Sequence, residues 1–200
     1  MSGLRFVAAL ALALAAAPAA LPARAADDAG GFITKLGDQT LALLRSKTGS
    51  PAEREQEFDQ IVDRSFDVAR IARFVLGRYW AGASADERKQ FAEAFERYMV
   101  GVYWQRFSAY SGETFRVTGE RPDASGASTV TTEVDRPNGQ APAKVEWSVT
   151  KEGDGYRIED VSIEGISQAL TYRQEFASIM ERDGGKVAAL TDELRRKTRG

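Results

Sequence analysis

The sequence FDVARIARFVLGRYW, residues 66–80, decides how the rest of the chain is arranged. Its apolar residues recur at i, i+3, i+4, i+7, i+8 and i+11, which is one face of an α-helix. Phe66, Phe74 and Trp80 lie off this stripe and widen the apolar surface. A helix with so broad an apolar surface either packs against partners on more than one side or lines a cavity. The stripe itself consists of Val68, Ile71, Ala72, Val75, Leu76 and Tyr79.

Further helices are predicted on both sides of this stretch. A first amphipathic helix covers roughly residues 28–47, and Ser50-Pro51-Ala52-Glu53 opens a second with a capping box and a proline at its first position. The organising helix should weaken at Gly77 and end at 81–83. Ser84-Ala85-Asp86-Glu87 is another capping box, and it opens the longest helix, which runs to about residue 110. Each aromatic residue of that helix is typical of core packing, and as a set they suit a wide apolar interior.

After residue 111 the apolar period changes from 3.6 residues to 2, which is typical of β-strands. The pattern predicts an antiparallel meander of four strands with one apolar and one polar face. In the fourth strand the alternation slips between Ile158 and Val161, which predicts a β-bulge near Glu159-Asp160. Two more amphipathic helices should follow, separated by a break at 183–185. The strands lie near residues 114–118, 128–135, 144–150 and 156–163.

The N-terminus has the features of a secretory signal peptide. Arg5 precedes an apolar run over residues 6–21, and Ala23-Arg24-Ala25 matches a small-residue cleavage site. The run is short for a membrane span and contains Pro18. We therefore expect residues 1–25 to be removed, leaving residues 26–200 as a single exported domain with a net charge of −4 instead of −2.

Composition excludes several classes of function. The chain contains no cysteine and no histidine, which excludes disulfides, thiol catalysis and the commonest zinc, copper and haem ligands. Its mildly acidic balance is unlike that of a nucleic-acid-binding domain. No phosphate-binding glycine loop and no G-x-S-x-G motif is present. An all-carboxylate calcium or magnesium site stays open, but no D-x-[DN]-x-[DN]-G loop is present, and we expect neither a metal nor a cofactor.

The carboxylates give no clear sign of catalysis. Asp67 and Asp160 have no partner that the sequence identifies, and Asp160, at the predicted bulge, is expected to bond nearby backbone. What remains is apolar volume, contributed by aromatic-rich helices that face the apolar side of a sheet. Such an interior is either a solid core or a ligand pocket, and the periodicity alone favours the solid core.

Three separated stretches resemble one family. They are residues 66–80, ASADERKQFAEAFERYM at 83–99, and IEDVSIEGISQALTYRQEF at 158–176. Together with the signal peptide they are similar to the MlaC family of periplasmic phospholipid-binding proteins, whose relatives include toluene-tolerance auxiliary proteins and hopanoid-associated HpnM proteins. The resemblance runs in order from about Phe58 to Leu194, nearly the whole exported chain.

This resemblance implies an α+β fold in which helices pack on a curved antiparallel four-stranded sheet, related to the nuclear-transport-factor-like cone. It also implies a soluble, monomeric periplasmic carrier whose cargo is a phospholipid with buried acyl chains. Its partners would be an inner-membrane ABC transporter complex (MlaFEDB-like) and an outer-membrane lipoprotein complex (MlaA-like). A hopanoid-linked, HpnM-like carrier, a cone-fold enzyme and an interaction module with a solid core stay open as alternatives.

Strand alternation then gives candidate lipid-binding residues. One face of the sheet should look into the cavity, beneath apolar residues from three helical segments. From the sheet these residues are Val117, Val130, Val134, Val145, Trp147 and Val149. From the helical segments they are Tyr79, Phe95, Met99, Tyr103, Ile166 and Leu170.

Overall fold

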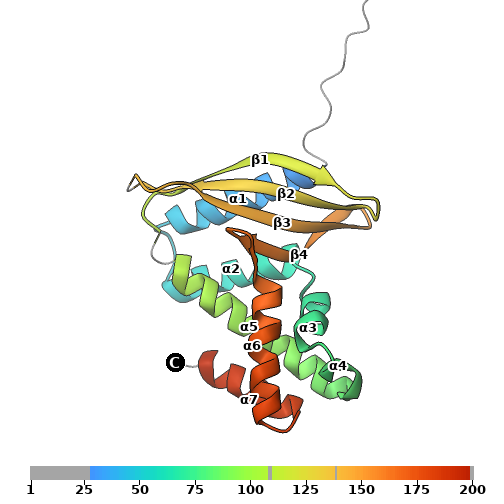
Figure 1. Ribbon diagram of the computed structural model, residues 1–200. Helices are drawn as coiled ribbons and strands as arrows, with labels where there is room; N and C mark the ends of the chain where they lie inside the picture. The colour runs from blue at the N-terminus through green and yellow to red at the C-terminus, as the bar shows by residue number, and fades with distance from the viewer. Residues whose placement is uncertain (1–27, 108–109, 138, 199–200) are drawn as a thin grey trace, which may run out of the picture.

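The computed structural model describes residues 28–107, 110–137 and 139–198. The predicted signal peptide lies outside these residues. An antiparallel sheet covers one side of the molecule and the helices pack beneath it, which confirms the predicted α+β fold (Figure 1). The helices are α1 (Ala29–Arg45), α2 (Pro51–Ser65), α3 (Val68–Leu76), α4 (Tyr79–Gly82), α5 (Ala85–Phe107), α6 (Gln168–Arg182) and α7 (Val187–Thr198). The strands are β1 (Thr114–Pro122), β2 (Ala127–Asp135), β3 (Ala143–Glu152), β4 (Gly155–Ile163) and β5 (Ile166–Ser167).

Both predicted capping boxes are present. At the start of α2 the Glu53 backbone N–H donates to Ser50 Oγ at 3.2 Å, and the Ser50 backbone N–H donates to Glu53 Oε2 at 2.6 Å. Ser84 and Glu87 make the same reciprocal pair at the start of α5. Each box satisfies backbone donors that the first helical turn leaves without partners.

The organising helix is shorter than predicted. It ends at Leu76, because Gly77 adopts a φ of 56°, a left-handed conformation that is open to glycine and breaks the helical geometry. Four residues of helix, α4, follow separately. At the other end Phe66 forms a bridge to Ile158 in β4 instead of belonging to the helix, and Asp67 caps α3 by accepting from the Arg70 backbone N–H.

The sheet has the strand order β1-β2-β3-β4-β5, with antiparallel pairing throughout. The predicted bulge is confirmed: Ser148 pairs with Asp160 and Val149 with Ile158, so Glu159 has no counterpart on β3. The fifth strand, which the sequence did not predict, is a two-residue extension that pairs Ile166 with Ile163.

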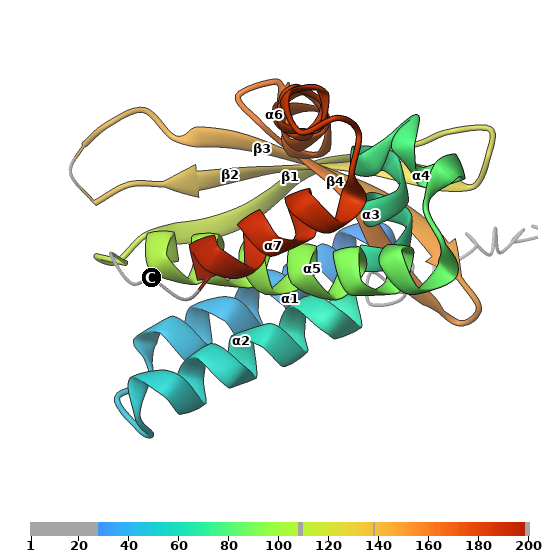
Figure 2. The same cartoon turned by 90° about the horizontal axis from the view of Figure 1, so that it is seen from below.

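The interior has two parts, and α5 runs through both (Figure 2). One part, the helical part, lies among α3, α5, α6 and α7, where aromatic rings pack tightly. Phe91 and Phe95 in α5 both meet Phe176 of α6 edge to face, with ring centroids 6.1 and 5.8 Å apart. The other part lies between the sheet and the α1–α2 hairpin.

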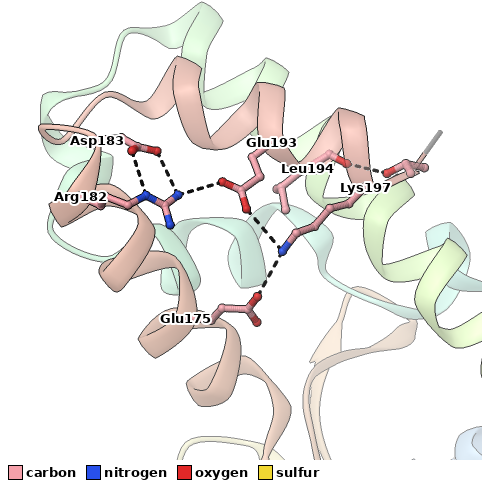
Figure 3. A network of polar contacts seen from close by, with 7 residues as sticks. Glu175, Arg182, Asp183, Glu193, Leu194 and Lys197 are labelled. Carbon is pink, nitrogen blue, oxygen red and sulfur yellow. Dashed lines mark hydrogen bonds and ion pairs between the residues drawn. The ribbon is translucent and has the colours of Figure 1, made fainter. Parts of the chain in front are cut away.

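Ion pairs fasten α7 to α6 at the edge of the helical part (Figure 3). Arg182 contacts Asp183 and Glu193, each at 3.2 Å. Lys197 lies 3.5 Å from both Glu193 and Glu175. No helix within the described residues is long and apolar enough to cross a membrane.

Candidate functional site

A cavity of about 640 Å³ lies between the inner face of the sheet and helices α1, α2, α5 and α6. Its volume is in the range of small-molecule binding sites in proteins. The wall is mostly aliphatic and aromatic. From the helices it includes Leu36, Leu41, Phe58, Ile61, Met99 and Phe107. From the sheet it includes Phe115, Val134, Val145, Trp147, Val161 and Ile163.

The side chains of helix α1 fill one end of the inner face of the sheet and leave the other end open to the cavity. At its start the Gly30 backbone N–H donates to Glu120 Oε2 at 2.8 Å, so the chain lies close against β1 there. Ala29 and Ile33 then pack with Val130 and fill that end of the inner face. One turn beyond Ile33, Gly37 faces the Phe115 ring, and from Leu36 onward α1 lines the cavity.

A buried hydrogen-bonded chain holds the indole ring of Trp147 at the wall. Its Nε1–H donates to Thr132 Oγ1 at 2.9 Å, and the Thr132 hydroxyl donates to the carbonyl oxygen of Val145 at 3.1 Å. Thr132 is completely buried. The ring of Phe115 meets the indole edge to face from β1. Trp147 therefore presents its apolar surface to the cavity with its polar atom satisfied.

Two tyrosines bring hydroxyl groups to the wall. Tyr103 comes from α5 and Tyr172 from α6. Burial raises the pKa of both phenols, and the nearby Tyr103 raises the pKa of Tyr172 further. Both phenols are therefore neutral at physiological pH, and they add polarity without charge.

The three carboxylates at the wall are all engaged by the protein. Glu159 pairs with Arg70 at 3.1 Å, and Asp160 accepts from the Ala169 backbone N–H at 2.9 Å. The second contact confirms that Asp160 bonds nearby backbone. Glu113 accepts from the backbone N–H and the hydroxyl of Ser111, which lowers the pKa of Glu113.

The structure brings five of the twelve predicted site residues to the cavity wall and places seven elsewhere. Those at the wall are Met99, Tyr103, Val134, Val145 and Trp147. Those elsewhere are Tyr79, Phe95, Val117, Val130, Val149, Ile166 and Leu170.

These seven residues lie away from the cavity because tertiary packing separates residues that share a face of a helix or of the sheet. Val130 and Val149 are buried in the filled end of the sheet, and Val117 packs there too. Phe95 is buried in the helical part, and Tyr79 packs against its edge. Two others reach solvent: Ile166 is 61% exposed and Leu170 46% exposed.

The α1–α2 hairpin and β4 contribute wall residues that are not among the twelve predicted ones, and β1 contributes Phe115 instead of Val117. Leu36, Leu41 and Phe58 belong to amphipathic stripes that were visible in the sequence. Phe115 follows the alternation of β1 and could have been assigned to the wall from its period, whereas Val161 lies beyond the slip in β4 and could be assigned only with the bulge taken into account. Which helix faces them depends on the way the hairpin folds back, which local periodicity does not encode.

Comparison with known proteins gives the family and the fold. The toluene tolerance protein ttg2D of Pseudomonas putida is 23% identical over 163 residues, which are 81% of this chain and 75% of that protein. A phospholipid-binding protein from Ralstonia solanacearum, solved in complex with a phospholipid, superposes with a TM-score of 0.73 at 24% identity. That match covers 86% of this chain and 97% of the other, and it shows a shared fold.

The family model for MlaC protein matches residues 34–196, from the middle of α1 nearly to the end of α7. The match therefore includes both the helical part and the whole cavity. With this coverage, and with the fold shared along nearly its entire described length, the chain belongs to the MlaC family.

Proposed function

We propose that this protein is a soluble periplasmic phospholipid carrier that buries acyl chains in the cavity between the sheet and helices α1, α2, α5 and α6. The observation that carries the proposal is the cavity itself: about 640 Å³ of space with a largely apolar wall, inside a folded domain. A solid-core interaction module needs no such space. Apolar space of this kind suits hydrocarbon, which water solvates poorly.

The cavity has a definite capacity. A water molecule occupies about 30 Å³ in the liquid, and a methylene group is of similar size, so the space holds roughly 20 methylene groups. That corresponds to one long acyl chain or to two chains inserted part of the way. At about 0.8 kcal/mol for each buried methylene the gross gain is about 16 kcal/mol, which exceeds the usual association cost of about 4–15 kcal/mol.

A carrier of this kind exchanges its cargo with membranes at both ends of its path. We propose export through the N-terminal signal peptide and exchange with an inner-membrane ABC transporter complex and an outer-membrane lipoprotein complex. Membership of the MlaC family supports these partners. The mild negative charge of the exported chain would also limit its adhesion to anionic membrane surfaces.

Native mass spectrometry of the protein exported from a bacterial host tests the proposal. The expected result is a mature chain with one bound lipid, which organic extraction identifies as a phospholipid. An extracted polycyclic lipid would favour the hopanoid-linked alternative. An empty chain that takes up no lipid from vesicles after delipidation would contradict the carrier function.

Catalysis is not part of this proposal. The chain has no histidine or cysteine, and the three carboxylates at the wall are engaged by a cation or by hydrogen-bond donors. Bound lipid recovered chemically unchanged after long incubation is therefore expected. Recovery of hydrolysed or isomerised lipid, absent from a heat-denatured control, would contradict this expectation.

A further inference from the structure

The charged side chains at the cavity wall differ in whether they have ion-pair partners. The carboxylates Glu113, Glu159 and Asp160 are all held by other groups of the protein, as described above. The two cations, Arg106 and Arg136, are not held in this way. Within the described residues neither guanidinium forms an ion pair with a carboxylate.

Within the part of the chain that the structure describes, the contacts of the two arginines occupy few of their N–H donors. The Arg106 guanidinium lies over the ring of Tyr103, 5.5 Å from its centroid, which fixes the side chain against the wall. Arg136 Nη1 donates to the carboxamide oxygen of Gln140 at 3.1 Å. Both arginines are exposed to solvent, so they line the cavity where it opens.

Both arginines line the same cavity. Arg106 lies in the last turn of α5, and Arg136 directly follows the end of β2. The C-terminal end of α5 and the β2–β3 turn lie on the same side of the molecule in both views (Figures 1 and 2). Glu113 adjoins this region, because the next residue, Thr114, pairs with Asp135. The cavity wall thus carries two guanidiniums without an ion-pair partner among the described residues, whereas its three carboxylates are each held by other groups of the protein.

We propose that Arg106 and Arg136 form a subsite for the phosphate group of the lipid headgroup at the mouth of the cavity. This inference rests on the carrier function proposed above. Acyl chains inside the apolar space place the headgroup at an opening, and guanidinium groups bind phosphate oxygens through paired N–H donors. A guanidinium without an ion-pair partner suits a phosphodiester, which carries one negative charge. A lipid without phosphate would leave both guanidiniums without a partner.

The test uses two lipids with identical acyl chains, phosphatidylglycerol and diacylglycerol, which differ in the phosphate and its headgroup. The delipidated full-length exported chain is loaded with a polarity-sensitive fluorophore, and each lipid displaces it at low ionic strength. We expect wild-type protein to bind phosphatidylglycerol about tenfold more tightly than diacylglycerol, as two charge-assisted contacts at exposed sites can together supply. Sodium chloride should reduce this preference.

The variant R106Q/R136Q should bind diacylglycerol as wild type does and should lose most of the preference for phosphatidylglycerol. R116Q is the matched control, because Arg116 pairs with Glu133 and Asp135 on the outer face of the sheet and does not line the cavity. R106K should keep part of the preference, since lysine retains the charge but loses the paired donors.

The outcomes separate the subsite from the carrier function. A double variant that keeps the wild-type preference, or a wild-type preference that salt does not reduce, would overturn the subsite and leave the carrier function standing. Wild-type protein that binds neither lipid would overturn both. Free glycerol phosphate should not displace the fluorophore, because the chains supply most of the affinity; complete displacement by it would assign the site to soluble phosphates.

Discussion

Trp147 and Thr132 form a hydrogen bond of 2.9 Å from the indole N–H to the threonine hydroxyl, and this bond ties the cavity wall to the adjacent strand. Thr132 is fully buried, and its hydroxyl donates a hydrogen bond to the carbonyl oxygen of Val145. A polar side chain on the apolar face of β2 therefore fixes the orientation of the largest ring at the wall.

Replacing Thr132 with valine should preserve its shape and leave the indole N–H without an acceptor. We expect a loss of about 1–3 kcal/mol in the free energy of unfolding and a change in tryptophan fluorescence. Thr131→Val, on the opposite face of the same strand, should change both quantities much less. Equal denaturation midpoints for Thr132→Val and wild type would show that the bond contributes no net stability.

The same substitution at two sites of β3 should distinguish the cavity from the packed interior. Val145 lines the cavity, whereas Val149, four residues along on the same face, is buried against Val130 and Ile158. Val145→Trp should fold normally and retain much less lipid. Val149→Trp should overpack the filled end and cost about 1–3 kcal/mol or more.

Both variants must be compared by thermal melting after delipidation, because bound lipid raises apparent stability by mass action. Lipid occupancy is then measured separately by mass spectrometry. A Val145→Trp variant with full lipid occupancy would show that Val145 does not line the cavity. A Val149→Trp variant as stable as wild type would show that the filled end of the sheet also has room.

Gly37 permits α1 to lie against the Phe115 ring. A Cβ atom at Gly37 would come within 2.4 Å of two ring carbons, far closer than van der Waals contact. Gly37→Ala should therefore destabilise the fold and displace the ring. Gly101→Ala in α5, where nothing lies within 4 Å of a new Cβ, should instead stabilise by about 1 kcal/mol. Chemical denaturation measures the change in the free energy of unfolding for both variants. A stabilised Gly37→Ala variant would contradict the close approach of α1 to the Phe115 ring.

Glu96 should make stability depend on pH. Its pKa is raised, first by burial and then by the nearby charges of Asp59 and Asp63. Because the folded state holds this proton to a higher pH than the unfolded state does, stability falls as pH rises from the ordinary glutamate pKa through the raised one. Glu96→Gln should therefore be more stable than wild type at pH 7, and its advantage should shrink in acid.

Melting temperatures of the two proteins between pH 4 and pH 8 test this expectation. Glu57→Gln is a suitable control, because Glu57 is exposed on α2. An advantage of Glu96→Gln that is constant with pH would mean that the ionisation of Glu96 is not its cause.

The amino-acid sequence by itself determined the local structure of this protein. The capping boxes at Ser50 and Ser84, the change of period after residue 111 and the slip that marks the Glu159 bulge all depend on neighbouring residues, and the structure confirms them. The sequence also shows Gly77, where a positive φ ends the helix instead of only weakening it.

The tertiary structure alone decided where the cavity lies. Val130, Val134, Val145 and Val149 share one face of the sheet, yet the first and last are packed while the middle two face open space. The alternation of apolar and polar residues shows which face of a strand is apolar. It does not show whether that face borders a solid core or a cavity. Whether a cavity remains depends on where α1 crosses the sheet and how closely it approaches the strands. Contacts between residues distant in sequence, such as Gly30 with Glu120 and Gly37 with Phe115, set the distance between α1 and the sheet.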